Sequence, residues 1–337
     1  MKILEGKNEV DEQLWERFIY EHPNGNVFHT PQMFQVYENT KRYKPLILAL
    51  EKEGEIKGML IAVIEKVLNG LLGEYSARSI IRGGPLVENN DKELCKLLLD
   101  NYNEIAKKHA ILSQVRNFHD TLNYEFIFKE NGFYFLDHLN IFINLDVSKE
   151  KLWKSLQSKS RNKIRKARKL GVEVEIDTSN EGLIESYGIL KEVYHKARLP
   201  LPDITFFQNI ITHFTKDPAI KIFVAKFNNE IIACRIALLY KSVVYDFFAG
   251  AKSKHHHKCP NDILPWEIFI WAKGNGYTLF DFGGAGSPNV PYGVRDYKMK
   301  FGGELMRFGR YEKIHKPTLF SIAKRAFLVW QKLKFTF

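Results

Sequence analysis

The sequence predicts an α/β protein with mixed sheets, because one set of elements occurs in both halves of its 337 residues. The first half is expected to contain strands over 45–51 and 56–64, a glycine-rich strand ending near Gly83, a helix over 91–109 and a strand over 111–115. The second half repeats this order, with strands over 219–227, 231–240 and 243–249, a helix over 261–273 and a strand over 278–282. An antiparallel meander followed by a crossover helix and a further strand is typical of a mixed sheet.

Local patterns justify these elements and their repetition. The strands are short apolar runs, and tight turns containing Gly54 or Asn228-Asn229 join the first two strands of each half. The apolar stretches 46–50 and 222–225 fall at matching places about 175 residues apart, which favours duplicated domains over a solenoid. The alternative is that two common hairpin-plus-helix units coincide by chance.

Chain length and one change in composition predict the domain boundaries. A chain of this length has room for two domains of roughly 150 residues each. An apolar strand over 139–145 gives way to a charged helix near residues 146–148. We therefore expect a first domain over 1–146, a second over 147–312 and a basic amphipathic C-terminal helix over 313–337.

Composition excludes several classes of protein. Hydrophobic residues make up 45% and charged residues 26%, which is the profile of a globular chain rather than a disordered one. The 50 basic residues outnumber the 39 acidic ones, giving a net charge of +11 that favours an anionic partner such as nucleic acid, a phosphorylated substrate or an acidic membrane. The N-terminus lacks the apolar core of a signal peptide, and each long apolar run is interrupted by a charge. Three scattered cysteines fit a reducing compartment, so a soluble cytoplasmic protein is expected.

The segment 151–171 is the first candidate binding element. It contains nine basic residues and no acidic one. On a single helix, Leu152, Ile164 and other apolar residues would share one side, and Arg161 and Arg165 would belong to a neighbouring cationic stripe. Arginines one turn apart suit phosphate oxygens, so the segment predicts contact with phosphate or RNA. A solvated, solubilising helix is the equally weighted alternative.

The segment 281–303 is the second candidate. Its six glycines and two prolines disfavour a regular helix over most of its length, and it follows a strand, where α/β proteins place functional loops. As an extended segment, it would turn Lys298 and Lys300 to one face and the apolar residues between them to the other. The alternative is a long surface loop with incidental lysines.

Two further segments suggest weaker possibilities. Three adjacent histidines, His255 to His257, favour an exposed turn over a metal site, because no second cluster has ligand spacing. We therefore expect no metal. The tail from Lys313 carries only positive charges beside apolar residues, which fits either a helix packed on its own domain or peripheral contact with an anionic membrane.

A series of motifs, in order, resembles the FemA/FemB/FemX-like aminoacyltransferases and their acyltransferase relatives. The first is Asn26-Val-Phe-His-Thr-Pro, and the helix of 159–174 is similar to the one that opens the second domain in that family. The later motifs are Asp246-Phe-Phe-Ala-Gly-Ala, Leu264-Pro-Trp-Glu, Phe280-Asp-Phe-Gly-Gly and Tyr297-Lys-Met-Lys-Phe-Gly-Gly. The resemblance spans about residues 25–312 and is specific as a series. It departs from the pattern of the peptidoglycan enzymes at Met33 and Tyr37, where those enzymes carry Trp and a phosphate-binding Lys.

The resemblance implies two tandem GNAT-like domains and an acyltransferase of aminoacyltransferase or N-acetyltransferase type. Such an enzyme moves an acyl or aminoacyl group from aminoacyl-tRNA or acyl-CoA, without a tightly bound cofactor, to an amine of a cell-envelope precursor. The acceptor would be a peptidoglycan peptide, a sugar or a lipid. The phosphate loop of ordinary acetyl-CoA-dependent GNAT enzymes is absent from the sequence, which argues against simple acetyl transfer.

The resemblance also suggests roles for individual residues. Lys298 would stabilise developing negative charge, and Asp281 would act as base or orienting group. The remaining candidates would hold phosphates (Arg161, Arg165 and Lys300) or line the acyl channel (Tyr245 and Tyr292). The alternative function is a non-catalytic protein that binds RNA or a membrane surface on the same scaffold.

Overall fold

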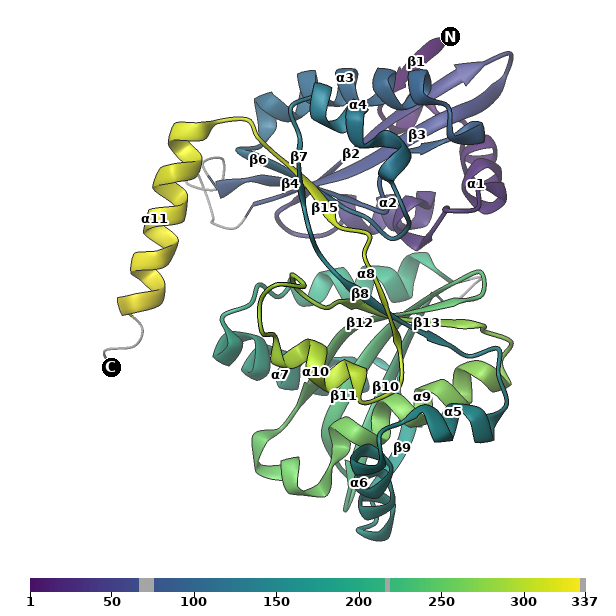
Figure 1. The fold of residues 1–337 in the computed structure, drawn as a ribbon, viewed down its shortest axis with the longest axis vertical. Coiled ribbons are helices and arrows are strands. Elements are labelled where there is room, and N and C mark those ends of the chain that lie inside the picture. Colours follow the sequence, from purple (N-terminus) through teal and green to yellow (C-terminus); the bar gives the residue numbers. More distant parts are fainter. Residues whose placement is uncertain (67–75, 216–218, 334–337) are drawn as a thin grey trace. The chain divides into compact units, whose positions relative to one another are not determined.

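A computed structural model describes residues 1–66, 76–215 and 219–333, with side chains described up to residue 325. The chain forms two compact units. The first contains Met1–Asp137 and Phe308–Phe337, and the second contains His138–Arg307. Each unit is a mixed sheet with packed helices (Figure 1), which confirms the predicted α/β class.

The first unit has a sheet of order β1-β2-β3-β4-β6-β15-β7, with β5 also paired to β3. Its strands are β1 (Lys2–Glu5), β2 (Tyr43–Lys52), β3 (Glu55–Glu65), β4 (Arg78–Arg82), β5 (Leu86–Val87), β6 (Leu112–Arg116), β7 (Tyr134–Leu136) and β15 (Arg310–Ile314). Its helices are α1 (Glu12–Glu21), α2 (Pro31–Glu38), α3 (Lys92–His109), α4 (Glu125–Glu130) and α11 (Pro317–Leu333). The core of this unit forms where α3 and α4 bury Leu98, Tyr102 and Phe128 with strand residues.

The second unit has a sheet of order β14-β8-β13-β12-β11-β10-β9. Its strands are β8 (Asn140–Asn144), β9 (Glu173–Ile176), β10 (Ile220–Phe227), β11 (Glu230–Tyr240), β12 (Val243–Ala251), β13 (Leu279–Gly284) and β14 (Glu304–Met306). Its helices are α5 (Lys149–Ser155), α6 (Ser158–Lys169), α7 (Asn180–Ala197), α8 (Ile204–His213), α9 (Pro260–Gly274) and α10 (Gly293–Met299). The main core lies between the sheet and α9, around Phe269, Phe280 and Phe282.

The two units repeat one topology, as the sequence predicts. Two antiparallel pairings, β2 with β3 and β3 with β4, precede α3 and the parallel pairing of β4 with β6. In the second unit, β10, β11 and β12 pair in the same way before α9 and the parallel strand β13. Both hairpin turns have two successive residues with positive φ, Glu53-Gly54 and Asn228-Asn229, which is the backbone that tight two-residue turns require.

The observed domain boundaries differ from the predicted ones because of the pairing of two strands, β8 and β15. β8 pairs with β13 and β14, so the chain enters the second unit at His138 and not at 147. β15 pairs with β6 and β7 of the first sheet, so the chain has returned to the first unit by Phe308, before the predicted end at 312. Both domain boundaries are set by the backbone pairing of short strands. A change in amino-acid composition does not reveal that pairing.

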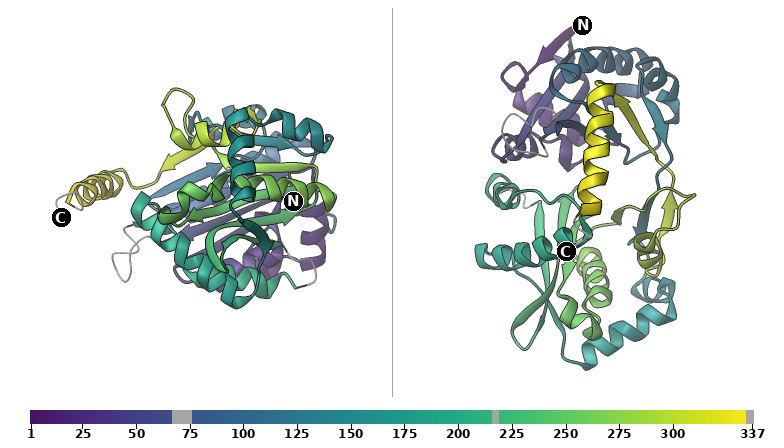
Figure 2. Two further views of the ribbon diagram at one scale, coloured as in Figure 1. Left: turned by 90° about the horizontal axis from the view of Figure 1, so that it is seen from below. Right: turned by 90° about the vertical axis from the view of Figure 1, so that its left-hand side faces the viewer.

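The C-terminal helix begins later than expected, and the last four residues of the predicted range lie outside the described residues. Lys313 belongs to β15, and α11 begins at Pro317 and follows that strand (Figure 2). Proline is favoured in the first turn of a helix because the missing N–H would have no partner there. No helix in the described part of the chain has the length and apolar composition needed to cross a membrane.

The basic segment forms two helices and not one. α5 ends at Ser155 and α6 begins at Ser158, with Leu156 and Gln157 in extended conformation between them. The predicted apolar side is largely buried, as shown by Leu152, Leu156 and Ile164, but Leu170 is exposed. Burial of Leu156 in the core explains the break, since a continuous helix would rotate the following residues away from their observed positions.

Candidate active site

The parallel strand pair at the centre of each sheet distinguishes the two units. In the first unit, all five residues of β4 pair with β6. In the second unit, β12 pairs with β13 only from Val243 to Tyr245, although β12 continues to Ala251 and β13 to Gly284. The strands therefore separate, and backbone groups of both face a gap. Such groups need partners from a side chain, water or a ligand.

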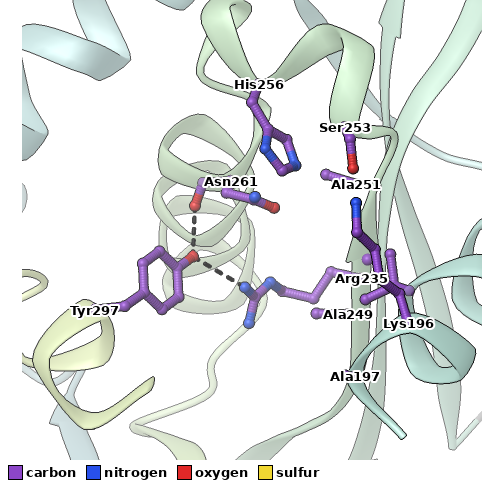
Figure 3. A pocket seen from close by; sticks show the side chains of 11 residues that line it. Lys196, Ala197, Arg235, Ala249, Ala251, Ser253, His256, Asn261 and Tyr297 are labelled. Atoms are coloured by element: carbon purple, nitrogen blue, oxygen red, sulfur yellow. Dashed lines mark hydrogen bonds between the residues drawn. The ribbon is translucent and has the colours of Figure 1, made fainter. Parts of the chain in front are cut away.

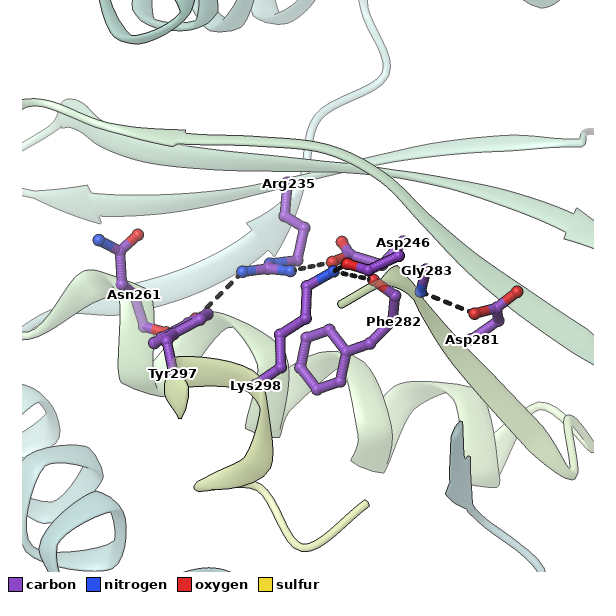
Figure 4. Close-up of polar contacts among 9 residues, drawn as sticks. Arg235, Asp246, Asn261, Asp281, Phe282, Gly283, Tyr297 and Lys298 are labelled. Carbon is purple, nitrogen blue, oxygen red and sulfur yellow. Dashed lines mark hydrogen bonds and ion pairs between the residues drawn. The ribbon is translucent and has the colours of Figure 1, made fainter. Parts of the chain in front are cut away.

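Lys298 enters this gap from α10. Its ammonium group donates hydrogen bonds to the carbonyl oxygens of Phe282 and Gly284, the latter at 2.9 Å (Figure 4). An ammonium group has three donors, and the third has no partner among the described residues. Burial lowers the pKa of Lys298, while the carboxylate of Asp246 opposes that effect. The structure thus places a fixed cation, with a spare donor, where the two strands part.

The expectation of an extended segment around Lys298 is wrong. Residues Gly293–Met299 form the helix α10, and Lys300 continues its backbone conformation. Successive helical residues differ by about 100°, so Lys298 and Lys300 point in different directions. Lys298 reaches the gap, whereas Lys300 contributes electrostatically at Asp262, in the first turn of α9. The glycines of this segment lie mainly before and after α10, which is why their number did not exclude the helix.

A buried polar network adjoins Lys298. The guanidinium of Arg235 in β11 forms an ion pair with Asp246 in β12, and both side chains are at least nine-tenths buried. Arg235 also donates to the hydroxyl of Tyr297 at 3.1 Å, and Tyr297 donates to the carbonyl oxygen of Asn261 at 2.5 Å. The network links two strands, α9 and α10. It holds Tyr297, the residue preceding Lys298, in place.

A cavity of about 420 Å³ lies along the unpaired end of β12 (Figure 3). Ala249, Gly250 and Ala251 of that strand form one wall, and Arg235, Asn261 and Tyr297 of the polar network form another. Lys196 and His256 add basic groups at its edge. Small residues on β12 leave space, and the unpaired strand edge offers backbone donors and acceptors. The cavity can therefore hold an extended polar group such as an acyl or aminoacyl chain.

Asp281 lies near the gap but not beside the Lys298 ammonium. It pairs in register with Tyr245 and Phe142, and it alternates with Phe280 and Phe282, which face α9. Its side chain therefore projects from the opposite face of the sheet. Burial raises the pKa of Asp281 to about 6, although the carboxylate accepts a hydrogen bond from the Gly283 N–H at 2.7 Å. The carboxylate on the α9 face is that of Asp246.

The structure does not gather the remaining predicted residues around Lys298. Arg161 donates to the carbonyl oxygens of Lys154 and Leu156, at the end of α5. Arg165 lies over the ring of Trp153, at 5.3 Å from its centroid. These two guanidinium groups have intramolecular partners, and neither lines the cavity. Their proposed phosphate contacts remain predictions.

The two tyrosines have distinct surroundings. Tyr245 is half-buried at the closed end of the β12–β13 pair, where burial raises its pKa. Tyr292 is 40% exposed, and its ring covers Gly286 at a distance that leaves no room for a Cβ. Neither residue lines the cavity beside β12. Their role in an acyl channel remains a prediction.

The basic helix α6 packs beside α9, where ion pairs neutralise part of its charge. Lys163 lies 3.4 Å from Asp262, and Arg168 lies 2.6 Å from Glu267. Lys159 and Lys166 have no carboxylate partner among the described residues. A cationic surface therefore remains beside the first turn of α9, close to the Asn261 end of the cavity.

Sequence reasoning missed Arg235 and Asp246. The available signal was a single arginine in an otherwise apolar strand, together with an aspartate in the next strand. A buried charge requires a compensating partner, so this pattern predicts a pair across the hairpin. The histidine segment has a simpler explanation, because the His255 ring nitrogen lies 3.1 Å from Glu230.

Comparison with known proteins identifies the fold and the proteins that this chain resembles. An acetyltransferase (GNAT) domain model matches residues 154–299. Lipid II:glycine glycyltransferase of Staphylococcus aureus is 26% identical, and the match covers 95% of each chain. The structure of FemX has a TM-score of 0.72 at 18% identity, covering 96% of this chain and 99% of that one.

Two further structures have the same fold at lower similarity. L-PGS from Bacillus licheniformis has a TM-score of 0.58 at 17% identity, covering 93% of this chain and 96% of that chain. A tandem GNAT protein from the clavulanic acid biosynthesis pathway has a TM-score of 0.62 at 9% identity, covering 93% of this chain and 98% of that chain. These likenesses confirm two tandem GNAT-like domains. Together with the glycyltransferase match, they make the chain similar in sequence and fold to the FemA/FemB/FemX-like acyltransferases.

Proposed function

We propose that this acyltransferase moves an aminoacyl group from an aminoacyl-tRNA to an amine of a peptidoglycan precursor. The observation that supports this most directly is the Lys298 ammonium, which has a spare donor in the gap between β12 and β13. The amine nitrogen attacks the ester carbonyl carbon, and negative charge develops on the carbonyl oxygen. Lys298 stabilises that charge. Collapse of the intermediate breaks the ester C–O bond, the ribose hydroxyl takes up a proton, and the attacking nitrogen loses one.

Two features favour an RNA-linked donor over acyl-CoA. The loop between β12 and α9 contains a run of histidines and lysines in place of a glycine-rich phosphate loop. The first turn of α9 contains the carboxylate of Asp262, which disfavours a pyrophosphate at that helix end. The cationic surface of α6 instead offers several positive charges along one side, as a nucleic-acid backbone requires.

The acceptor is proposed from the glycyltransferase of Staphylococcus aureus, whose name specifies lipid II. The present chain covers 95% of that protein. A peptidoglycan peptide amine is therefore the first acceptor to test, followed by amines of sugars and lipids. Such acceptors are available at the inner face of the membrane, so we propose a cytoplasmic location with peripheral membrane contact.

Direct transfer by the purified protein tests this proposal. Charged tRNA pools and acyl-CoA are supplied separately with a lipid-linked or nucleotide-linked peptide precursor, and the product is detected by mass spectrometry. We expect aminoacylated precursor with charged tRNA only. Product formed with acyl-CoA alone would show that acyl-CoA, and not aminoacyl-tRNA, is the donor. The absence of transfer from either donor would favour a non-catalytic binding protein.

A further inference from the structure

A row of arginines crosses the sheet of the first unit, whereas Lys298 belongs to the second unit. Arg82 of β4 is the register partner of Arg116 of β6, and Arg116 is the register partner of Arg310 of β15. Register partners point to the same face of a sheet, on strands about 4.8 Å apart. Arg78 lies four residues before Arg82 in β4 and therefore also projects from this face. Four guanidinium groups thus share one region of one face.

Intramolecular carboxylates balance only part of this charge. Glu65 of β3 accepts from Arg78 at 3.1 Å and from Arg82 at 2.8 Å. Arg116 has no carboxylate within ion-pair distance in the described part of the chain, and its Nε donates to the amide oxygen of Gln114 at 2.7 Å. The four arginines, set against the carboxylates of Glu65 and of Glu312, which lies on the same face of β15, leave this region with a net charge of +2.

The surroundings of Arg116 are unfavourable for a cation. Burial, together with Arg82 and Arg310, lowers the pKa of Arg116 to about 9. Like charges at register positions destabilise a sheet, and a desolvated charge without a partner destabilises it further. Nearby aromatic rings offer only weak compensation, since Arg82 lies 5.7 Å from the ring centroid of Phe28. A bound anion would neutralise these guanidinium groups and would explain an arrangement that is unfavourable without one.

We propose that the row of Arg82, Arg116 and Arg310 is a binding site for a dianionic oxyanion, such as a phosphate or diphosphate group or a dicarboxylate. Each guanidinium group can donate two parallel N–H···O hydrogen bonds to such an oxyanion. Because these guanidinium groups lie on adjacent strands, the row can contact two neighbouring oxyanions. A dianion would neutralise the surplus of two charges. Arg116 is partly exposed and so remains open to a ligand.

Binding and stability measurements on the full chain test this site. Titration calorimetry and thermal unfolding are performed with inorganic pyrophosphate, phosphate and succinate at constant ionic strength, with chloride as the reference. The variants are Arg116→Gln and, as a control with the same change of charge in the same unit, Arg17→Gln. Arg17 is half exposed, and its guanidinium lies 3.8 Å from Glu55.

We expect wild type and Arg17→Gln to bind pyrophosphate equally and to unfold at higher temperature in its presence. Arg116→Gln should bind pyrophosphate at least tenfold more weakly. Without ligand, its unfolding temperature should equal or exceed that of wild type, because the substitution removes a positive charge that the neighbouring arginines repel. Stronger binding of pyrophosphate than succinate would identify phosphate groups as the ligand, and the reverse would identify carboxylates. The proposal would be overturned by wild-type affinity in Arg116→Gln, or by the absence of binding of all three anions to wild type. Because no transfer reaction is measured, these results are separable from failure of the proposed function.

Discussion

The ammonium group of Lys298 donates a hydrogen bond to the carbonyl oxygen of Gly284 at 2.9 Å, in the part of β13 that has separated from β12. The corresponding strands of the first unit, β4 and β6, remain paired along the whole of β4. The same topology therefore forms a closed sheet in one unit and an open one in the other. In the second unit, the separated ends of β12 and β13 leave backbone groups unpaired, a cavity lies along β12 and the Lys298 ammonium enters the gap. This difference supports the proposal that the transfer reaction takes place in the second unit.

The ion pair of Arg235 and Asp246 is expected to be essential for the stability of the second unit. Arg235→Met leaves a buried carboxylate uncompensated, which should lower the free energy of unfolding by about 3–5 kcal/mol. Arg235→Met combined with Asp246→Asn should recover part of that loss. Urea unfolding of the two single variants and the double variant measures the coupling. Additive losses would contradict a direct interaction between the two groups.

Asp281 should make stability depend on pH. Because its pKa is raised to about 6 in the folded protein, the folded state binds the proton more tightly than the unfolded state does. The contribution of Asp281 to stability therefore falls as pH rises from about 4 to about 6 and is constant above that range. Asp281→Asn should raise the free energy of unfolding at pH 7.5 by up to about 3 kcal/mol, and the gain should disappear near pH 4. A gain independent of pH would show that ionisation of Asp281 is not its cause.

The same variant tests the proposed role of Asp281 as a base. If its carboxylate accepts or orients the proton of the acceptor amine, Asp281→Asn should lower kcat about 100-fold or more. Normal kcat in the stabilised variant would assign Asp281 to the fold alone. The pH profile of kcat/KM provides a second measurement, since loss of the residue should remove the acidic limb.

Arg161 is expected to stabilise a helix end, because its guanidinium donates to carbonyl oxygens that end α5. Arg161→Ala should lower the free energy of unfolding by about 1 kcal/mol, the net value of such hydrogen bonds. If that is its only role, KM for the donor will be unchanged. An increase in KM without loss of stability would instead support the phosphate contact predicted from the sequence.

Replacement of Lys159 and Lys166 tests whether α6 contacts RNA. Neither lysine has a carboxylate partner in the described residues, so the substitutions break no ion pair. Replacing both by Gln should raise KM for charged tRNA and reduce its dependence on salt concentration, with kcat unchanged. Each single variant is also compared with Lys169→Gln, at the C-terminal end of the same helix, which makes the same change in net charge. An unchanged salt dependence would favour a solubilising helix.

Strong local patterns allowed much of the fold to be predicted. Apolar runs bounded by Gly54 or Asn228-Asn229 predicted both hairpins, because such turns specify the pairing of their neighbours. The sequence did not predict that β8 joins the second sheet and β15 the first, because both pairings join segments far apart in sequence.

The candidate site was only partly predictable. Lys298 was identified through its motif, but its helix was not, because glycines on either side of α10 hid a short helical segment. Arg235 was visible as an interruption of an apolar strand, yet its contact with Tyr297 depends on tertiary packing.

Single-turnover and steady-state measurements of transfer by Lys298→Met, with Lys300→Met as control, test whether the Lys298 ammonium stabilises the oxyanion. Removal of one group that stabilises an oxyanion typically lowers kcat about 100- to 1,000-fold. We expect a loss of that size for Lys298→Met with little change in KM, and a much smaller change in kcat for Lys300→Met. Circular dichroism and urea unfolding verify that both variants are folded. A folded Lys298→Met variant with the kcat of wild type would show that Lys298 does not stabilise the transition state.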